Sequence, residues 1–155
     1  MDLLSGRVPT VCFVAVPRPL ASLGVPIACV ALAGTGGALA MLAWRRGGIT
    51  ELLASGGFLL APGVSRIAAA MGGLVIHVVW MALWSVVFAA SMQRDRRPSP
   101  SIVAIIVAAV ALGVTFIAPA AAGGPLATLP PPERIVVHAV LAISLMIGMR
   151  LAPRG

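Results

Sequence analysis

The sequence has few acidic residues and no lysine. Four of its 155 residues are acidic, and all eleven basic residues are arginine. Hydrophobic residues make up 60% of the chain and charged residues only 10%, with a mean hydropathy of +1.08. A soluble domain of this length has too much surface per volume to hide so many apolar side chains. These proportions argue against an ordinary soluble domain and indicate that a lipid bilayer surrounds most of the chain.

Carboxylates are missing from every long apolar run. All four acids lie in predicted arms or loops, at Asp2, Glu51, Asp95 and Glu133. Proton-coupled transporters usually carry an acid inside the membrane, and intramembrane proteases need a paired nucleophile or acid. Ser85 and Ser144 have no suitable base at helical spacing. The sequence therefore disfavours both classes, and we do not expect an enzyme.

Cysteine is also scarce, with Cys12 and Cys29 as the two examples. They are too far apart for a CxxC motif, and both have apolar neighbours. We expect two small buried hydrophobic side chains rather than a disulfide or a metal site.

Four long apolar runs predict an all-α integral membrane protein, with four transmembrane helices in a single bundle. A crossing needs about 20 apolar residues, and the predicted spans are 24–44, 67–92, 101–118 and 132–152 within one membrane domain, residues 1–155. Residues 1–20 contain three prolines and are predicted to form an irregular N-terminal arm. The first loop is predicted to contain a short interfacial helix over 49–60, because its apolar centre is too short to cross the bilayer.

Prolines and glycines punctuate these spans. Pro26 is expected in the first turn of the first span, where its missing N–H costs nothing. Ser99 is predicted to cap the third span, with Pro100 at the first helical position. Residues 120–133 are rich in proline and glycine, and we expect them to form a stiff loop.

The distribution of arginines predicts how the chain is oriented in the membrane. With four spans, Arg7, Arg18, Arg94, Arg96, Arg97, Arg150 and Arg154 share one side, and Arg45, Arg46, Arg66 and Arg134 share the other. The positive-inside rule then predicts a multi-pass protein of the cell inner membrane with both termini in the cytoplasm. Lipid headgroups explain the net charge of +7, so no nucleic-acid partner is expected.

Small residues mark predicted contacts between helices. Gly34 and Gly37 in the first span and Gly73 in the second are expected to let helix backbones approach closely. A phosphate-binding loop is not expected, because no strand precedes these glycines and no lysine follows them.

His77 is the main candidate for chemistry. It shares a helix face with Gly73, Trp80 and Trp84, and an imidazole in lipid needs a hydrogen-bond partner or a metal. The functional interpretation is a metal ligand, specifically the axial ligand of a haem or (bacterio)chlorophyll, with both tryptophans as walls and Gly73 providing room. A small residue four positions before a histidine, followed by tryptophan, resembles the pigment-binding helix of bacterial light-harvesting polypeptides. The interpretation we prefer is a hydrogen bond to a neighbouring helix or a partner subunit, with no cofactor.

His138 is the second histidine. Counted from the starts of their spans, His77 lies about 15 Å deep and His138 about 5 Å deep. This offset of about 10 Å exceeds what helix tilt absorbs easily, so we do not expect both to ligate one haem.

These observations lead to three hypotheses of function. The first is a non-catalytic subunit or scaffold of a larger bacterial membrane complex, with other membrane subunits and the lipid bilayer as its partners. The second is a small haem- or (bacterio)chlorophyll-binding protein using His77. The third is a small transporter or channel.

Overall fold

The structure is a computed structural model that describes residues 20–93, 99–119 and 124–152. Within these ranges every regular element is a helix. The six helices are α1 (Leu20–Trp44), α2 (Ile49–Phe58), α3 (Arg66–Met92), α4 (Pro100–Ile117), α5 (Pro125–Thr128) and α6 (Pro131–Leu151).

Four of these helices, α1, α3, α4 and α6, are long and apolar enough to cross a membrane. Their apolar segments run from 18 to 27 residues, which at 1.5 Å per residue is about the thickness of a hydrocarbon core or more. The prediction of an all-helical fold with four helices long and apolar enough to span a membrane is therefore confirmed for the described residues. The four apolar helices make this a multi-pass membrane protein.

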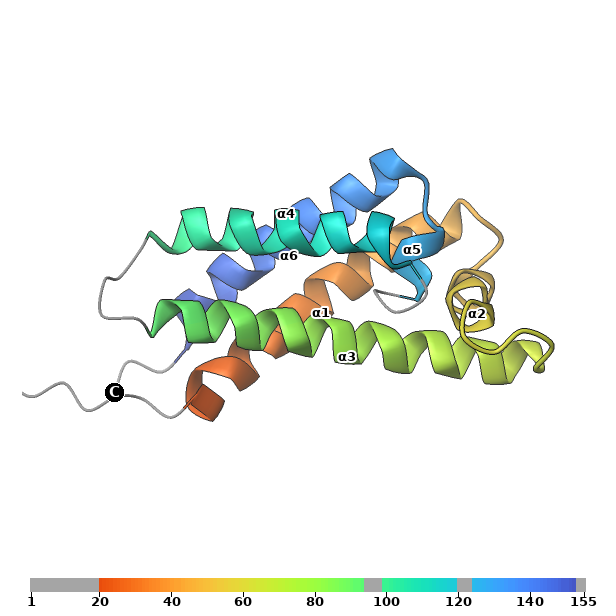
Figure 1. Ribbon diagram of the computed structural model, residues 1–155, viewed down its shortest axis with the longest axis horizontal. Helices are drawn as coiled ribbons and strands as arrows, with labels where there is room; N and C mark the ends of the chain where they lie inside the picture. The colour runs from red at the N-terminus through yellow and green to blue at the C-terminus, as the bar shows by residue number, and fades with distance from the viewer. Residues whose placement is uncertain (1–19, 94–98, 120–123, 153–155) are drawn as a thin grey trace, which may run out of the picture.

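The four long helices form a bundle. Helices that are consecutive in the sequence are not always the ones that pack most closely in it. α1 packs against α3 on one side and α6 on the other, and α4 packs against the same two helices. The order around the bundle is therefore α3, α1, α6, α4. The short helices α2 and α5 lie together at the end where α1 and α4 finish and where α3 and α6 begin (Figure 1).

Helix α1 begins earlier than the predicted span. It starts at Leu20, so Pro26 lies inside the helix instead of in its first turn, and that prediction is wrong. A membrane helix tolerates an internal proline because neighbouring groups can satisfy the freed carbonyl. The predicted arm over residues 1–20 lies outside the described residues, apart from Leu20 itself.

The other long helices begin and end within one residue of their predicted bounds. Ser65 caps α3 by accepting a hydrogen bond from the backbone N–H of Ala68 at 3.3 Å. Ser99 does occupy the position before α4 but makes no side-chain capping bond, so that part of the prediction is wrong. Glu133 lies in the first turn of α6 and Arg150 in the last, where each complements the helix dipole.

Helix α2 confirms the short helix predicted in the first loop, and it packs inward on α3. It is seen end-on in Figure 1, so it runs across the long helices instead of alongside them. A Cβ atom on Gly57 would overlap the backbone of Ala69, and a Cβ on Gly73 would overlap the carbonyl of Leu53. Glycine is therefore required for this close approach of α2 and α3.

The predicted loop over residues 120–133 is wrong in part, because it contains helix α5 and the start of α6. Leu126 and Leu129 are fully buried. Gly124 precedes α5 with φ +47, and a Cβ there would lie 3.1 Å from Ile76 of α3. Ser55 of α2 and Thr128 of α5 share a hydrogen bond of 2.9 Å. The two inter-helix connections thus pack against each other at this end of the bundle.

Cys29 differs from its prediction as well. It is exposed on the outer side of α1, because α1 turns its opposite face toward α3 and α6. Cys12 lies outside the described residues.

Candidate functional site

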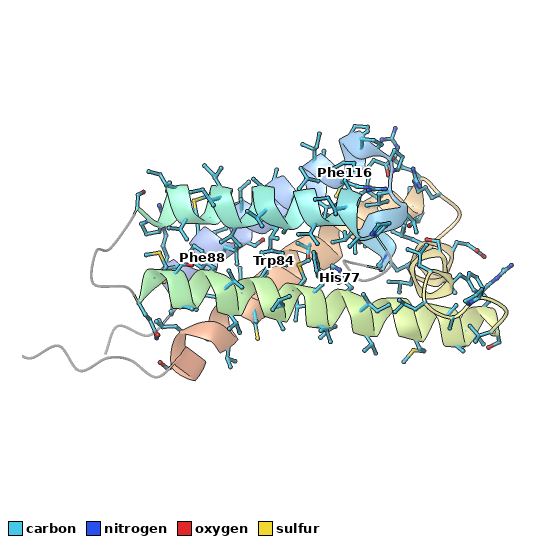
Figure 2. The ribbon with its side chains drawn as sticks, viewed as in Figure 1. His77, Trp84, Phe88 and Phe116 are labelled. Carbon is cyan, nitrogen blue, oxygen red and sulfur yellow. The ribbon has the colours of Figure 1, made fainter. Side chains whose placement is uncertain are left out.

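The candidate site is the interior face of α3. His77, Trp80, Trp84 and Phe88 are all buried on that face, and Figure 2 shows His77, Trp84 and Phe88 on the side of α3 that faces the other helices. The periodicity that predicted one shared face is therefore reproduced. The helix positions these side chains because residues four and seven positions apart return to the same side.

The imidazole of His77 has a partner on the neighbouring helix α1. Its Nε2 atom lies 3.3 Å from Oγ1 of Thr35, and both side chains are buried. The Thr35 hydroxyl donates its single hydrogen to the carbonyl of Ala31 at 2.7 Å. Oγ1 must therefore accept from His77, which places the imidazole proton on Nε2 and leaves Nδ1 with a bare lone pair.

Trp80 and Trp84 contact each other directly. Their ring centroids are 5.3 Å apart at an interplanar angle of 80°, an edge-to-face pair of the kind that aromatic rings favour. The two rings fill space inside the bundle. The arrangement that the cofactor hypothesis needs, two walls with an open slot between them, is not the one these two rings adopt.

The three glycines singled out in the sequence have different surroundings. Gly73 is closed by the backbone of α2, so it opens no room beside His77. Gly34 lies against Ser144 and Val140 of α6, where a Cβ atom would overlap the Ser144 hydroxyl. Around Gly37 a Cβ atom would meet nothing within 4 Å. Gly34 and Gly73 therefore lie at close contacts between helices, and Gly37 faces outward.

His138 of α6 has the opposite ring arrangement. Its Nδ1 atom lies 2.7 Å from the carbonyl oxygen of Arg134, which can only accept, so Nδ1 carries the proton. Its Nε2 atom is buried and has no hydrogen-bond partner among the described residues. A histidine that binds a metal usually donates its other N–H to a carbonyl in this way. By this geometry, the histidine whose Nε2 atom is free to bind a metal is His138, whereas the sequence indicated His77 as the metal ligand.

Helix α1 gives a common reference for the depth of the two histidines. Thr35 lies beside His77, and Gly34 lies beside the stretch of α6 between Val140 and Ser144. His138 is then about 6 Å from the level of Gly34, toward the end that holds α5. The two histidines differ in depth by about 5 Å along the bundle, about half of the offset expected from the sequence.

Four ring nitrogens in this interior have no hydrogen-bond partner among the described residues: Nδ1 of His77, Nε2 of His138, and Nε1 of Trp80 and of Trp84. Leaving a buried polar group unsatisfied costs about 1–3 kcal/mol. Four such groups would cost a sum comparable with the whole stability of a typical domain, about 5–15 kcal/mol. Buried polar groups in proteins nearly always have a hydrogen-bond partner, so we expect one for these four. The described residues contain no group of three or more histidine, cysteine or acidic side chains that could hold a metal ion.

Arg134 anchors the end of the bundle above His138. Its guanidinium donates to the carbonyls of Leu129 at 2.6 Å, Thr115 at 3.1 Å and Ala127, and it lies 4.8 Å from the ring centroid of Phe116. One side chain thus joins α4, α5 and α6. From the sequence, Arg134 could be assigned only to a membrane interface. Its three carbonyl partners come together only in the tertiary fold, so they could not be predicted.

Comparison with protein-family models, with curated proteins and with solved structures finds no match for this chain. Functional inference therefore depends on the geometry. Sequence reasoning missed two features of the site, the acceptor role of Thr35 and the free ring nitrogen of His138. Thr35 had a signal, because it is the one hydroxyl among the small residues between Ala31 and Leu39. The orientation of His138 had none.

Proposed function

We propose that the protein is a non-catalytic, multi-pass subunit of a larger bacterial membrane complex, and that the outer face of α1 contacts a transmembrane helix of a partner. The observation that carries this proposal is the contrast between the two faces of α1. Its inner face packs against α3 and α6 of the same chain. Its outer face is lined with small residues.

The outer face follows a strict helical spacing. Its exposed small residues are Cys29, Ala33, Gly37 and Ala40, at intervals of three and four that keep them on one side. At the C-terminal end of α1, Met41 and Trp44 are 77% and 90% exposed, and together with Ala40 they line a shallow hollow. Small residues at this spacing let another helix approach closely in lipid. α1 is also the least buried span: 22% of its most apolar 18-residue segment is buried within the protein, against 33–44% for the other three spans.

The interior favours a structural role over a catalytic one. The hydroxyls of Thr35, Ser85 and Thr115 donate to carbonyls of their own helices at 2.7 Å, as expected for serine and threonine in membrane helices. The described acids lie at the end of the bundle that holds α2 and α5. Glu51 pairs with Arg66 at 2.8 Å, and Glu133 pairs with Arg46 at 3.2 Å. The hydroxyl of Thr35 lies beside the imidazole of His77, but it donates its hydrogen to the carbonyl of Ala31 and not to His77.

The orientation completes the proposal. Four arginines lie at the end of the bundle that holds α2 and α5, namely Arg45, Arg46, Arg66 and Arg134. In the sequence, the other seven precede α1, join α3 to α4, or lie at and beyond the end of α6. An excess of seven over four favours both termini on the cytoplasmic side of the inner membrane.

A haem or (bacterio)chlorophyll protein is the alternative from another class. It needs Nε2 of His77 to exchange Thr35 for a metal and the bundle to open for the macrocycle. An absorption spectrum of the protein purified in mild detergent tests it, since a Soret or Qy band that His77→Ala abolishes would favour this alternative.

Cross-linking through Cys29 tests the subunit proposal directly. In a Cys12→Ala background, Cys29 is labelled with a benzophenone maleimide in native membranes and irradiated. We expect a cross-linked product between this chain and a different membrane protein, identified by mass spectrometry. Gly37→Leu, which fills the outer face, should reduce the yield of that product several-fold.

The matched control moves the probe to the outer side of α4. Ile106 is 55% exposed there, and Ile106→Cys in a chain without Cys12 and Cys29 carries the same label. This position should not give the same product. Cross-links to lipid alone, to a second copy of this chain, or equally from both positions contradict the proposal.

A further inference from the structure

The interior of the bundle presents two imidazoles in opposite neutral forms. His77 carries its proton on Nε2, because the Thr35 hydroxyl already donates its one hydrogen to the carbonyl of Ala31 and accepts from the ring. His138 carries its proton on Nδ1, because the carbonyl of Arg134 can only accept. Each ring therefore keeps one nitrogen with a free lone pair, Nδ1 of His77 and Nε2 of His138. The side chains are 4% and 3% exposed, so these lone pairs face protein and not lipid.

The same interior presents two free donors. The indole Nε1 atoms of Trp80 and Trp84 are buried and have no acceptor among the described residues. Trp80 follows His77 by about one helical turn and Trp84 by about two, on the same face of α3. The unmet hydrogen-bonding capacity is therefore two acceptors and two donors. A molecule that satisfies both kinds must itself donate and accept.

Space decides between the molecules that could do so. Met81, Phe88, Leu141 and Leu145 are fully buried in the same core, and α1 contacts α3 and α6 on both sides. A macrocycle would need these fully buried side chains to move apart. A water molecule needs little volume, donates two hydrogen bonds and accepts two, and commonly satisfies buried polar groups of this kind.

We propose that the bundle interior binds several water molecules, between the level of His138 and that of Trp84. Water near the histidines donates to Nδ1 of His77 and Nε2 of His138, and water further along α3 accepts from the indole N–H groups of Trp80 and Trp84. Because α3 and α6 lie diagonally across the bundle, this water links two helices that share few direct contacts. The site does not involve the outer face of α1. This proposal can therefore be tested separately from the proposed role as a subunit.

Solid-state nuclear magnetic resonance of the full chain in lipid bilayers tests the proposal. With histidine and tryptophan labelled with nitrogen-15, and with His77→Asn and His138→Asn for assignment, we expect a protonated Nε2 on His77 and a protonated Nδ1 on His138. Magnetisation transferred from water should reach both rings and the indoles of Trp80 and Trp84 several-fold faster than it reaches the backbone amides of Leu141 and Leu145.

A fluorescence measurement needs no variant in the core. Trp44→Phe alters only an exposed side chain and leaves Trp80 and Trp84 as the two emitting residues. Hydrated indoles should emit at longer wavelength than indoles in a dry apolar core, and transfer to deuterated water should raise their intensity. Emission typical of a dry core, slow transfer from water, the same tautomer on both rings, or a stoichiometric metal lost in His138→Asn would each overturn the proposal.

Discussion

Two glycine-rich regions of this molecule have opposite surroundings. At the junction of α2 and α3, Gly57 and Gly73 meet backbone atoms so closely that neither position has space for a Cβ. On the outer face of α1, Gly36 and Gly37 meet nothing within 4 Å. Both regions contain the small residues that favour close helix packing in lipid. The first region uses them within the chain, whereas the second leaves them available.

This contrast shows why glycine in a membrane helix needs an explanation at each position. Glycine is unfavourable in a helix interior by roughly 0.5–1 kcal/mol relative to alanine. At Gly57 and Gly73 the approach of another backbone offsets that cost. At Gly37 nothing in the described part of the chain does so, which is what a partner helix on the outer face would explain.

The largest expected effect is that of Gly57→Ala. The new methyl group would overlap the backbone of Ala69, so α2 must move away from α3. Overpacking of this kind costs about 1–3 kcal/mol or more, and a clash with backbone should reach the upper part of that range. The measurement is the free energy of unfolding of the purified protein in a titration with denaturing detergent.

Gly37→Ala is the matched control on the other side of the comparison. It adds the same methyl group to a helix with open space around it, and the purified chain should be unchanged or stabilised by up to about 1 kcal/mol. Equal destabilisation by both substitutions would show that the outer face of α1 is as tightly packed as the junction.

Local sequence information predicts the spans but not which face of a span is inside. Hydropathy is a local property, so the spans predicted at 67–92, 101–118 and 132–152 agree with α3, α4 and α6 to within one residue, and the span predicted at 24–44 misses only the first four residues of α1. In lipid both faces of a helix are apolar, and no alternation of polar and apolar residues separates Gly34 from Gly37. Helix α5, the inward packing of α2 and the partner of His77 depend on contacts between residues far apart in the chain, so they could not be predicted locally.

A smaller effect is expected from Arg134→Met, which tests the polar contacts at the α2 and α5 end. The substitution removes donors from three carbonyls and the contact with Phe116. Each buried acceptor left unsatisfied costs about 1–3 kcal/mol, and access of headgroups and water at this end should limit the total to about 2 kcal/mol. Thermal unfolding measures it.

The control for Arg134→Met is Arg150→Met at the other end of α6, where Arg150 is exposed. Substitutions at such positions usually change stability by less than about 0.5 kcal/mol. If both variants lose the same stability, removal of a positive charge explains the effect and the carbonyl contacts do not.

The smallest effect belongs to Thr35→Val, on the inner face of α1. Valine has nearly the shape of threonine but leaves the buried Nε2–H of His77 without an acceptor, which costs about 1–3 kcal/mol. Because the bond is long, 3.3 Å, we expect a loss at the lower end of that range. Thr115→Val removes a hydroxyl that is equally buried and that donates to Leu112 of its own helix, so it reports the effect of losing a hydroxyl without a histidine partner. The stability difference between the two variants isolates the contact of α1 with α3, and Thr35→Ser should restore most of it. Equal losses would mean that packing, and not the bond between Thr35 and His77, holds the inner face of α1 in place.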